Sequence, residues 1–295
     1  MALRHGLATA TLPCGATYVL ALDEGDANEF LSDEDCEHYT THMSSLPAPS
    51  AFPNPVAFPE SRDDERGLQY WVTDPLGAAE QLRAFRYLSA ASDGDHPIVQ
   101  IGGHGSSLVR WVRATDRRGY LVSPFVSELD WCALTARVAG VADRVVLVQS
   151  SAERLPFEDR SIGLAFMPGV LHHTDAQLAL GEVRRVLAPG GRFASWDIYD
   201  SPAYRLGIRL FGKQEPVACV PLSAERLGTQ HDSTCRTEIE LSGAGPRYVF
   251  ALGSRLGLRP SRNLMFRAEP IDRFLARSPI GPATASMVSI RIEST

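Results

Sequence analysis

From residue 97 onward, short apolar runs alternate with segments of helical periodicity, and this alternation restricts the fold more than any other feature of the chain. Each run has the length of a buried strand, and each is followed by enough residues for a helix. Such crossovers between parallel strands are right-handed and build a doubly wound sheet. The predicted strands are 97–101, 119–123, 145–149, 162–167 and 192–198.

Two of the intervening helices have recognisable starts. Ser127 is expected to open one, and Thr174 with Gln177 three residues later forms a capping box for another. In a doubly wound sheet, ligands bind beyond the carboxyl ends of the strands. We therefore expect the loops that follow the strands to converge on one crevice; these are 102–106, 124–127, 150–154, 168–174 and 199–203.

Residues 1–90 are predicted to form an N-terminal helical cap, divided by a proline-rich linker at 46–60 that holds five of the 20 prolines. Its helices are expected from Ser32 to about Ser45 and from about Leu76 to Ala90. Residues 91–295 are assigned to the α/β domain, including a lid insertion at about 201–245. The tail adds a predicted helix at 247–257 and two predicted strands, 263–267 and 286–292.

The composition of the chain limits the kinds of molecule that we expect it to bind. The net charge of −6 has the wrong sign for a protein that neutralises nucleic-acid phosphates, and no apolar stretch reaches the roughly 18 residues that span a bilayer. The first residues also lack an apolar core of signal-peptide length, so a cytoplasmic location is the default. The five cysteines include no C-x-x-C pair, which favours reduced thiols. We expect a hydrophobic small-molecule partner, no nucleic acid and no membrane; a homodimer stays open.

Residues 150–193, SSAERLPFEDRSIGLAFMPGVLHHTDAQLALGEVRRVLAPGGRF, carry a family resemblance in the order and spacing of their motifs. They resemble the class I S-adenosylmethionine-dependent methyltransferases, in particular the small-molecule branch. The resemblance implies an α/β fold with a mostly parallel, seven-stranded, Rossmann-like sheet. It also implies S-adenosylmethionine as the cofactor.

The acidic positions by which this family holds the nucleotide are neutral here. They fall on Gln100 in the first strand, Phe125 after the second, Ser151 after the third and Gly163 in the fourth. Each lost hydrogen bond to a charged group is worth about 1.5–3 kcal/mol. Either backbone contacts and stacking on Phe125 hold the cofactor, or the crevice takes another ligand. The resemblance places cofactor contacts at Gly102, Gly103, Gly105, Phe125, Ser151, Ala152 and Met167.

Imidazoles are the candidate catalytic groups, because histidine is the usual general base near neutral pH. We predict catalytic roles for His104, which replaces a loop glycine, for His173, and for His231. Asp197 is predicted to orient a base or the substrate, whereas His172 is interpreted as part of the scaffold. No metal site is predicted. The spacing of His104, His173 and Asp197 does not support one, and although Cys36, His38 and His42 come close to a ligand spacing, the acidic residues beside them indicate a solvated face.

These features predict a methyltransferase-fold enzyme that acts on a small organic molecule, in a biosynthetic step of the natural-product tailoring kind. Methyl transfer from S-adenosylmethionine is the family's reaction. The alternatives are a cyclase, isomerase or lyase that uses the same histidines without the cofactor, and a non-catalytic partner of an active homologue. Fold alone does not choose among them.

Overall fold

The computed structural model of the 295-residue chain describes residues 3–4, 7–12, 15–21, 75–90, 97–211, 219–228, 234–258 and 262–295. The described strands are β1 (Ala8–Thr11), β2 (Thr17–Leu20), β3 (Ile98–Ile101), β4 (Gly119–Ser123), β5 (Val145–Gln149), β6 (Ile162–Pro168), β7 (Leu187–Ile198), β8 (Cys235–Ser242) and β9 (Met287–Ser294). The described helices are α4 (Pro75–Ser89), α5 (Ser106–Thr115), α6 (Val126–Val138), α7 (Ala176–Val186), α8 (Pro202–Phe211), α9 (Ala224–Leu227), α10 (Gly245–Arg255), α11 (Arg262–Arg277) and α12 (Gly281–Thr284), with short 3-10 turns η3 (Ala142–Arg144) and η4 (Leu171–His173).

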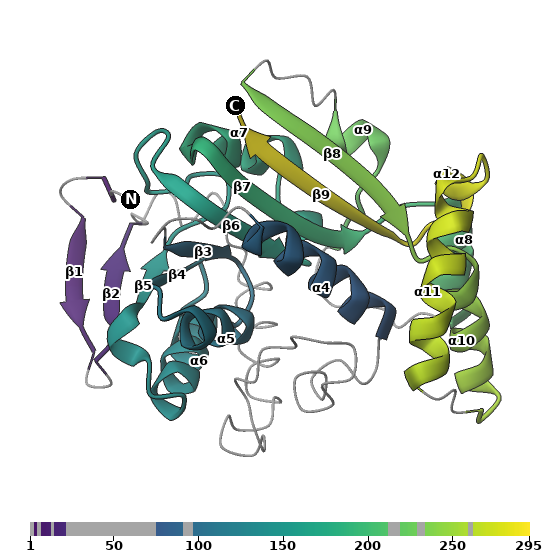
Figure 1. The fold of residues 1–295 in the computed structure, drawn as a ribbon, viewed down its shortest axis with the longest axis horizontal. Helices are drawn as coiled ribbons and strands as arrows, with labels where there is room; N and C mark the ends of the chain where they lie inside the picture. The colour runs from purple at the N-terminus through teal and green to yellow at the C-terminus, as the bar shows by residue number, and fades with distance from the viewer. Residues whose placement is uncertain are drawn as a thin grey trace.

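The strands form one sheet in the order β1-β2-β5-β4-β3-β6-β7-β9-β8 (Figure 1). The five strands predicted from apolar runs are its parallel centre, from β5 to β7. Strand β9 runs antiparallel between β7 and β8. The described sheet has nine strands and not the expected seven, because the N-terminal pair β1 and β2 extends it beyond β5.

Both faces of the central strands are buried, which is the expected state of a parallel sheet. In β3, Val99 and Ile101 belong to the core on one face and Ile98 to the core on the other. Helix α7 covers the first face, and α4, α5 and α6 cover the second (Figure 1). Phe85 anchors α4, because its ring meets Phe166 edge-on at 5.3 Å and Trp196 at 5.9 Å.

Several predictions about the ends of the chain are wrong. Residues 8–11 and 17–20 form two sheet strands and not part of a helical cap. Residues 263–267 lie inside helix α11 and not in a strand, since their apolar run continues with helical periodicity to Ala276. Residues 235–242, placed in the expected lid insertion, form strand β8. The helix predicted over Ser32–Ser45 and the proline-rich linker lie outside the described residues.

The cap of α7 is also one residue away from its predicted position. Asp175, and not Thr174, is the N-cap: its Oδ1 accepts from the amides of Gln177 at 3.0 Å and Leu178 at 3.1 Å. Aspartate is as good an N-cap as threonine, so the sequence did not decide which of these two neighbouring residues caps the helix.

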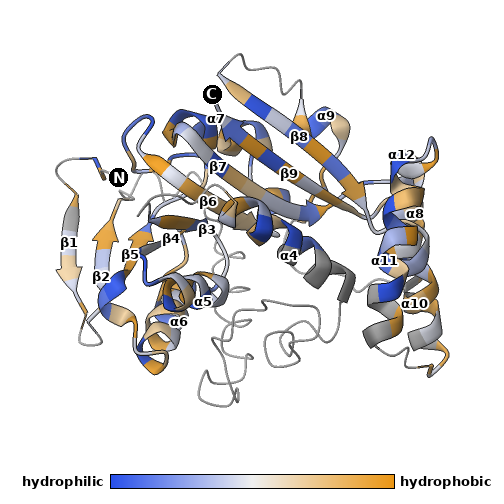
Figure 2. Cartoon of the chain, in the orientation of Figure 1, coloured by the Kyte–Doolittle hydropathy of each residue, from blue (hydrophilic) through white to orange (hydrophobic). Residues whose placement is uncertain are grey.

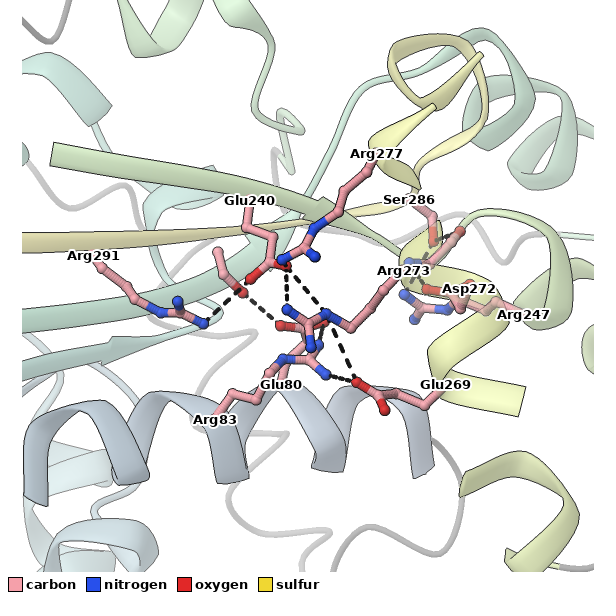
Figure 3. Close-up of polar contacts among 12 residues, drawn as sticks. Glu80, Arg83, Glu240, Arg247, Glu269, Asp272, Arg273, Arg277, Ser286 and Arg291 are labelled. Carbon is pink, nitrogen blue, oxygen red and sulfur yellow. Dashed lines mark hydrogen bonds and ion pairs between the residues drawn. The ribbon is translucent and has the colours of Figure 1, made fainter. Parts of the chain in front are cut away.

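A polar network ties helix α11 to the sheet (Figure 3). Glu240 on β8 accepts hydrogen bonds from Arg273 and Arg277 at 2.7 Å and from Arg291 at 3.3 Å. Arg83 on α4 pairs with Glu269 on α11. These contacts fix α11, which stands with α8, α10 and α12 at one end of the sheet (Figure 1).

Hydropathy follows this architecture. Figure 2 shows hydrophobic colour along the central strands, whereas β8 alternates between hydrophobic and charged residues. No helix in the described part of the chain has the length and apolar character needed to cross a membrane.

Candidate functional site

The loop after β3 is a tight glycine turn. Gly102, Gly103 and Gly105 have φ of +70°, +72° and +75°, a conformation that side chains disfavour. A Cβ on Gly102 would lie 2.6 Å from Cγ2 of Val170, and one on Gly105 would collide with Cys132. Gly103 is less crowded, because the nearest atom to an added Cβ would be Gln100 Nε2 at 3.4 Å. The loop is therefore packed on two sides and accessible beside Gly103.

Gln100 occupies the acidic position of the first strand and holds this loop with its neutral amide. Its Nε2 donates to the carbonyl of Gly102 at 2.8 Å, and its Oε1 accepts from the amide of Leu108 at 3.1 Å. The side chain is 2% exposed. Gln100 thus fixes the loop to the first turn of α5 and carries no charge.

A carboxylate that the sequence analysis missed lies beside the same loop. Glu128, in the first turn of α6, reaches back so that its Oε2 accepts from the hydroxyl of Ser123 at 2.6 Å, at the end of β4. The amide of Gly103 donates to the same carboxyl group. Burial raises the pKa of Glu128 to about 7, and these two hydrogen bonds oppose part of that rise. A titratable group therefore joins the end of β4 to the glycine loop.

The other predicted cofactor contacts differ in exposure. Phe125 is partly exposed and follows β4, where its carbonyl starts α6 by accepting from the amides of Glu128 and Leu129. Ser151 and Ala152 are buried after β5, and Met167 is fully buried in the core. Met167 has no exposed surface, so the structure gives no support to its predicted contact with the cofactor. The Glu153 carboxylate accepts from the amide of Asp175 at 3.0 Å, so it supports the start of α7.

His104 lies in the glycine loop, as predicted, and is partly exposed. Its ring meets Trp131 of α6 edge-on, with 6.5 Å between the ring centroids. An imidazole therefore stands at the mouth of the loop, beside the helix that carries Glu128.

Among the two histidines after β6, Asp197 pairs with His172 and not with His173. His172 Nδ1 lies 2.6 Å from Asp197 Oδ1, and the aspartate side chain is fully buried. The same Oδ1 accepts from the amide of Ile198 at 2.7 Å. The ring of His173 lies against that of His172, with centroids 3.9 Å apart. The interpretation of His172 as scaffold missed its buried partner.

The pairing sets the charge of His172. Burial lowers the pKa of His172. Hydrogen bonds to Asp197 and Cys219 raise it by more than burial lowers it, so the resulting pKa is about 10. His172 is therefore an imidazolium at neutral pH, which serves as a hydrogen-bond donor and a positive charge but not as a general base. His231 lies outside the described residues, and no three His, Cys, Asp or Glu side chains among those that are described are placed to hold a metal ion.

The residues that form this site lie in or next to a part of the chain that matches a known protein family. Residues 99–195 match the family model described as a methyltransferase domain. Over these residues the chain is similar to methyltransferase domains. The loop at 102–105 and the ends of β4, β6 and β7 all belong to this domain or adjoin it.

Relatives and solved structures agree with the domain assignment. The ubiquinone/menaquinone biosynthesis C-methyltransferase UbiE of Rubrivivax gelatinosus is 34% identical over 125 residues, which are 42% of this chain and 47% of that protein. The 27-O-demethylrifamycin SV methyltransferase of Amycolatopsis mediterranei is 32% identical over 136 residues, or 45% of this chain and 46% of the relative. The matched part therefore spans less than half of each relative.

The fold comparison covers more of the chain. Geranyl diphosphate C-methyltransferase from Streptomyces coelicolor A3(2), solved with S-adenosyl-L-homocysteine, superposes with a TM-score of 0.54 over 90% of this chain and 99% of that one. The sequence identity is 14%, so the likeness concerns the fold.

The residues around the glycine loop are compatible with S-adenosylmethionine, the cofactor that similarity to methyltransferases implies. Gly103 is partly exposed, and its backbone is less crowded than that of Gly102 and Gly105. Glu128 supplies a carboxylate at the end of β4, where Phe125 supplies none. The neutral acid positions found in the sequence are therefore only part of the site.

Proposed function

We propose that this chain is a small-molecule methyltransferase that binds S-adenosylmethionine against the Gly102–Gly105 loop, with Glu128 as the acceptor for the ribose hydroxyls. The observation that carries the proposal is the buried Glu128 carboxyl group, which bridges Ser123 and the amide of Gly103. Each hydrogen bond to a carboxylate contributes about 1.5–3 kcal/mol. Two such bonds from the ribose hydroxyls to Glu128 would replace most of the binding free energy that is lost at the neutral positions.

Bound S-adenosylmethionine supplies an electrophilic methyl group. The chain's own residues must then orient the acceptor and remove its proton. His104 stands in the loop itself, and His173 lies beside His172 after β6, so both are the proposed bases. Asp197 acts on the site through His172, whose positive charge favours an anionic oxygen on the acceptor.

The acceptor is proposed to be a lipophilic organic molecule. The two relatives are named for a quinone and a rifamycin, both small organic compounds. This supports a biosynthetic or tailoring step for the present chain as well.

The second candidate is a rearrangement, ring closure or elimination on the same scaffold without the cofactor. The neutral amide of Gln100 favours it, because both ends of that amide are used to hold the loop. The affinity of the chain for the adenosyl group distinguishes the two candidate functions.

Calorimetric titration with S-adenosylhomocysteine tests the proposal. We expect micromolar binding at pH 8, where Glu128 is ionised, and weaker binding at pH 6, since its pKa is about 7. Absence of binding at millimolar concentration would remove methyl transfer and leave the cofactor-independent reaction. Incubation with S-adenosylmethionine and lipophilic phenols, followed by mass spectrometry for one added methylene, then identifies the acceptor; His104→Ala is expected to abolish that gain while the fold stays intact.

A further inference from the structure

Three helices at one end of the sheet expose large apolar side chains. Helices α8, α10 and α11 stand together there (Figure 1). Residues 202–211, 245–258 and 262–280 hold eleven of the 18 large apolar side chains that are exposed in the described part of the chain. Single exposed apolar residues are common in proteins, but a cluster of them marks a surface that binds a partner.

The three helices pack closely against one another. A Cβ added to Gly207 of α8 would lie 3.4 Å from the ring of Tyr248 on α10. A Cβ added to Gly245 of α10 would lie 2.7 Å from Leu275 of α11. Helix α10 therefore touches both of the others, and the exposed sides of the three helices belong to one end of the molecule.

The exposed apolar residues have helical spacing. On α10 and the turn that continues it, they are Val249, Leu252 and Leu256. Phe274 of α11 is 74% exposed and shares one side of that helix with Leu264 and Ile271. Spacings of three, four and seven residues place side chains on the same face of a helix. Each helix thus turns an apolar stripe outward.

Arginine supplies the charge of this end of the molecule. Residues 202–211, 245–258 and 262–280 contain eight arginines and two acidic residues, although the net charge of the chain is −6. Both acidic residues, Glu269 and Asp272, are buried. Arg209 of α8 and Arg267 of α11 are exposed, and Arg267 lies one helical turn from Leu264 and from Ile271. The outward surface of these described segments is therefore both apolar and cationic.

We propose that α8, α10 and α11 form a docking surface for an anionic lipid bilayer. The apolar side chains enter the boundary between headgroups and acyl chains, and the arginines bind lipid phosphates. Helical surfaces that combine arginine with leucine, isoleucine and phenylalanine bind in this plane without crossing the bilayer. The sequence-based expectation of no membrane partner rested on the length of a spanning segment, which surface binding does not require.

Charge favours a bilayer over a second copy of the chain as the occupant. A two-fold contact through this face would place the same surface of each copy against the other, and so would bring arginines together. An anionic lipid offers the opposite charge, and arginine pairs with a phosphate through two parallel hydrogen bonds. The lipid acyl chains at the same time cover the apolar stripes.

The docking surface begins at the edge of the sheet that carries the glycine loop. Ile198 and Ser242, the last residues of β7 and β8, both pair with Met287 of β9. Helices α8 and α10 follow these two strands along the chain. A lipophilic acceptor dissolved in the bilayer would therefore enter near the carboxyl ends of the strands. This consequence rests on the proposed function, whereas the docking surface does not.

Vesicle flotation of the whole chain tests the proposal. Binding to vesicles of phosphatidylcholine alone is compared with binding to vesicles of equal parts phosphatidylcholine and phosphatidylglycerol. We expect the chain to bind the anionic vesicles more tightly, and the binding to weaken as salt is added. Absence of binding to the anionic vesicles at low salt overturns the proposal, as does equal binding to both kinds of vesicle.

Two variants and a matched control locate the contact. Phe274→Gln is expected to weaken binding to the anionic vesicles about tenfold, because a large apolar side chain leaves the bilayer boundary. Arg267→Gln is expected to weaken it about fivefold, through the loss of one charge near the lipid surface. Leu178→Gln replaces a side chain on α7 that is 56% exposed outside this surface, and it should bind like the wild type.

Equal affinities of Phe274→Gln and Leu178→Gln for the anionic vesicles contradict the proposal. Light scattering distinguishes the alternative occupant. A dimer that Phe274→Gln dissociates, in a chain that does not float with vesicles, would show that this face joins two copies and that the proposal is wrong. None of these measurements depends on S-adenosylhomocysteine binding, so this inference and the proposed methyl transfer fail separately.

Discussion

The hydroxyl of Ser123 donates to Oε2 of Glu128 at 2.6 Å, inside the protein and next to the glycine loop. The end of one strand and the first turn of the following helix thus share a single buried carboxyl group. This arrangement supplies the acidic group that the strand itself lacks.

The burial of Glu128 has a consequence for stability. Its pKa rises from 4.5 to about 7 in the fold, so the folded chain holds this proton more tightly than the unfolded chain. The stability that protonation contributes is complete below pH 4.5 and is lost as the pH rises through 7. We expect the free energy of unfolding to fall by about 3 kcal/mol across this window.

Urea unfolding at pH 5 and pH 8 measures this effect. Glu128→Gln should lose the corresponding part of the pH dependence and exceed the wild type in stability at pH 8. Asp130→Asn, an exposed position on the same helix, should behave like the wild type. Indistinguishable pH profiles for Glu128→Gln and wild type would show that the carboxyl group is not buried in this way.

His172 is a base whereas Glu128 is an acid, but the contribution of each group to folding stability is lost as the pH rises. Its pKa is raised from 6.5 to about 10, so its stabilising contribution is complete below pH 6.5 and disappears as the pH rises through 10. Asp197→Asn leaves a buried imidazolium without its counter-charge, which typically costs about 3–5 kcal/mol.

Denaturant titrations of Asp197→Asn, His172→Gln and the double variant at pH 7 check this pair. We expect the double variant to recover part of the loss caused by Asp197→Asn, because it removes both charges together. Additive losses in the double variant would mean that the two side chains do not interact.

The network around Glu240 should carry the attachment of α11. Burial raises the pKa of Glu240, but Arg273, Arg277 and Arg291 outweigh this and lower it overall. Its contribution to stability is therefore present above the ordinary pKa of 4.5 and is lost as the pH falls below it. Glu240→Gln leaves three arginines without their shared partner.

We expect Glu240→Gln to lose about 3 kcal/mol or more of unfolding free energy at pH 7, because one member of a half-buried ion network is removed. Glu238→Gln, two residues earlier on β8, removes a carboxylate that is 60% exposed and should change stability by less than about 1 kcal/mol. Equal effects of the two substitutions would contradict a special role for Glu240.

The central sheet could be predicted because its strands are buried on both faces and therefore appear as uninterrupted apolar runs. Strand β8 was missed for the converse reason: in Cys235–Ser242 charged residues alternate with apolar ones, and no run stands out. The run at 263–267 is too short to separate strand from helix by periodicity.

The sequence predicted the part of the site that is formed by the backbone of a motif, which is the Gly102–Gly105 loop. Glu128 escaped prediction because its side chain returns from the next helix to the strand end, a contact that position-by-position comparison does not contain. His172 and His173 are neighbours in the sequence, and only the turn η4 decides which of them meets Asp197.

The most direct measurement is the dissociation constant of S-adenosylhomocysteine for wild type, Glu128→Gln and Asp130→Asn at pH 8. Loss of a charged acceptor should weaken binding about tenfold to a hundredfold in Glu128→Gln and leave Asp130→Asn unchanged. Equal affinity in Glu128→Gln and wild type would contradict the claim that this carboxylate holds the nucleoside.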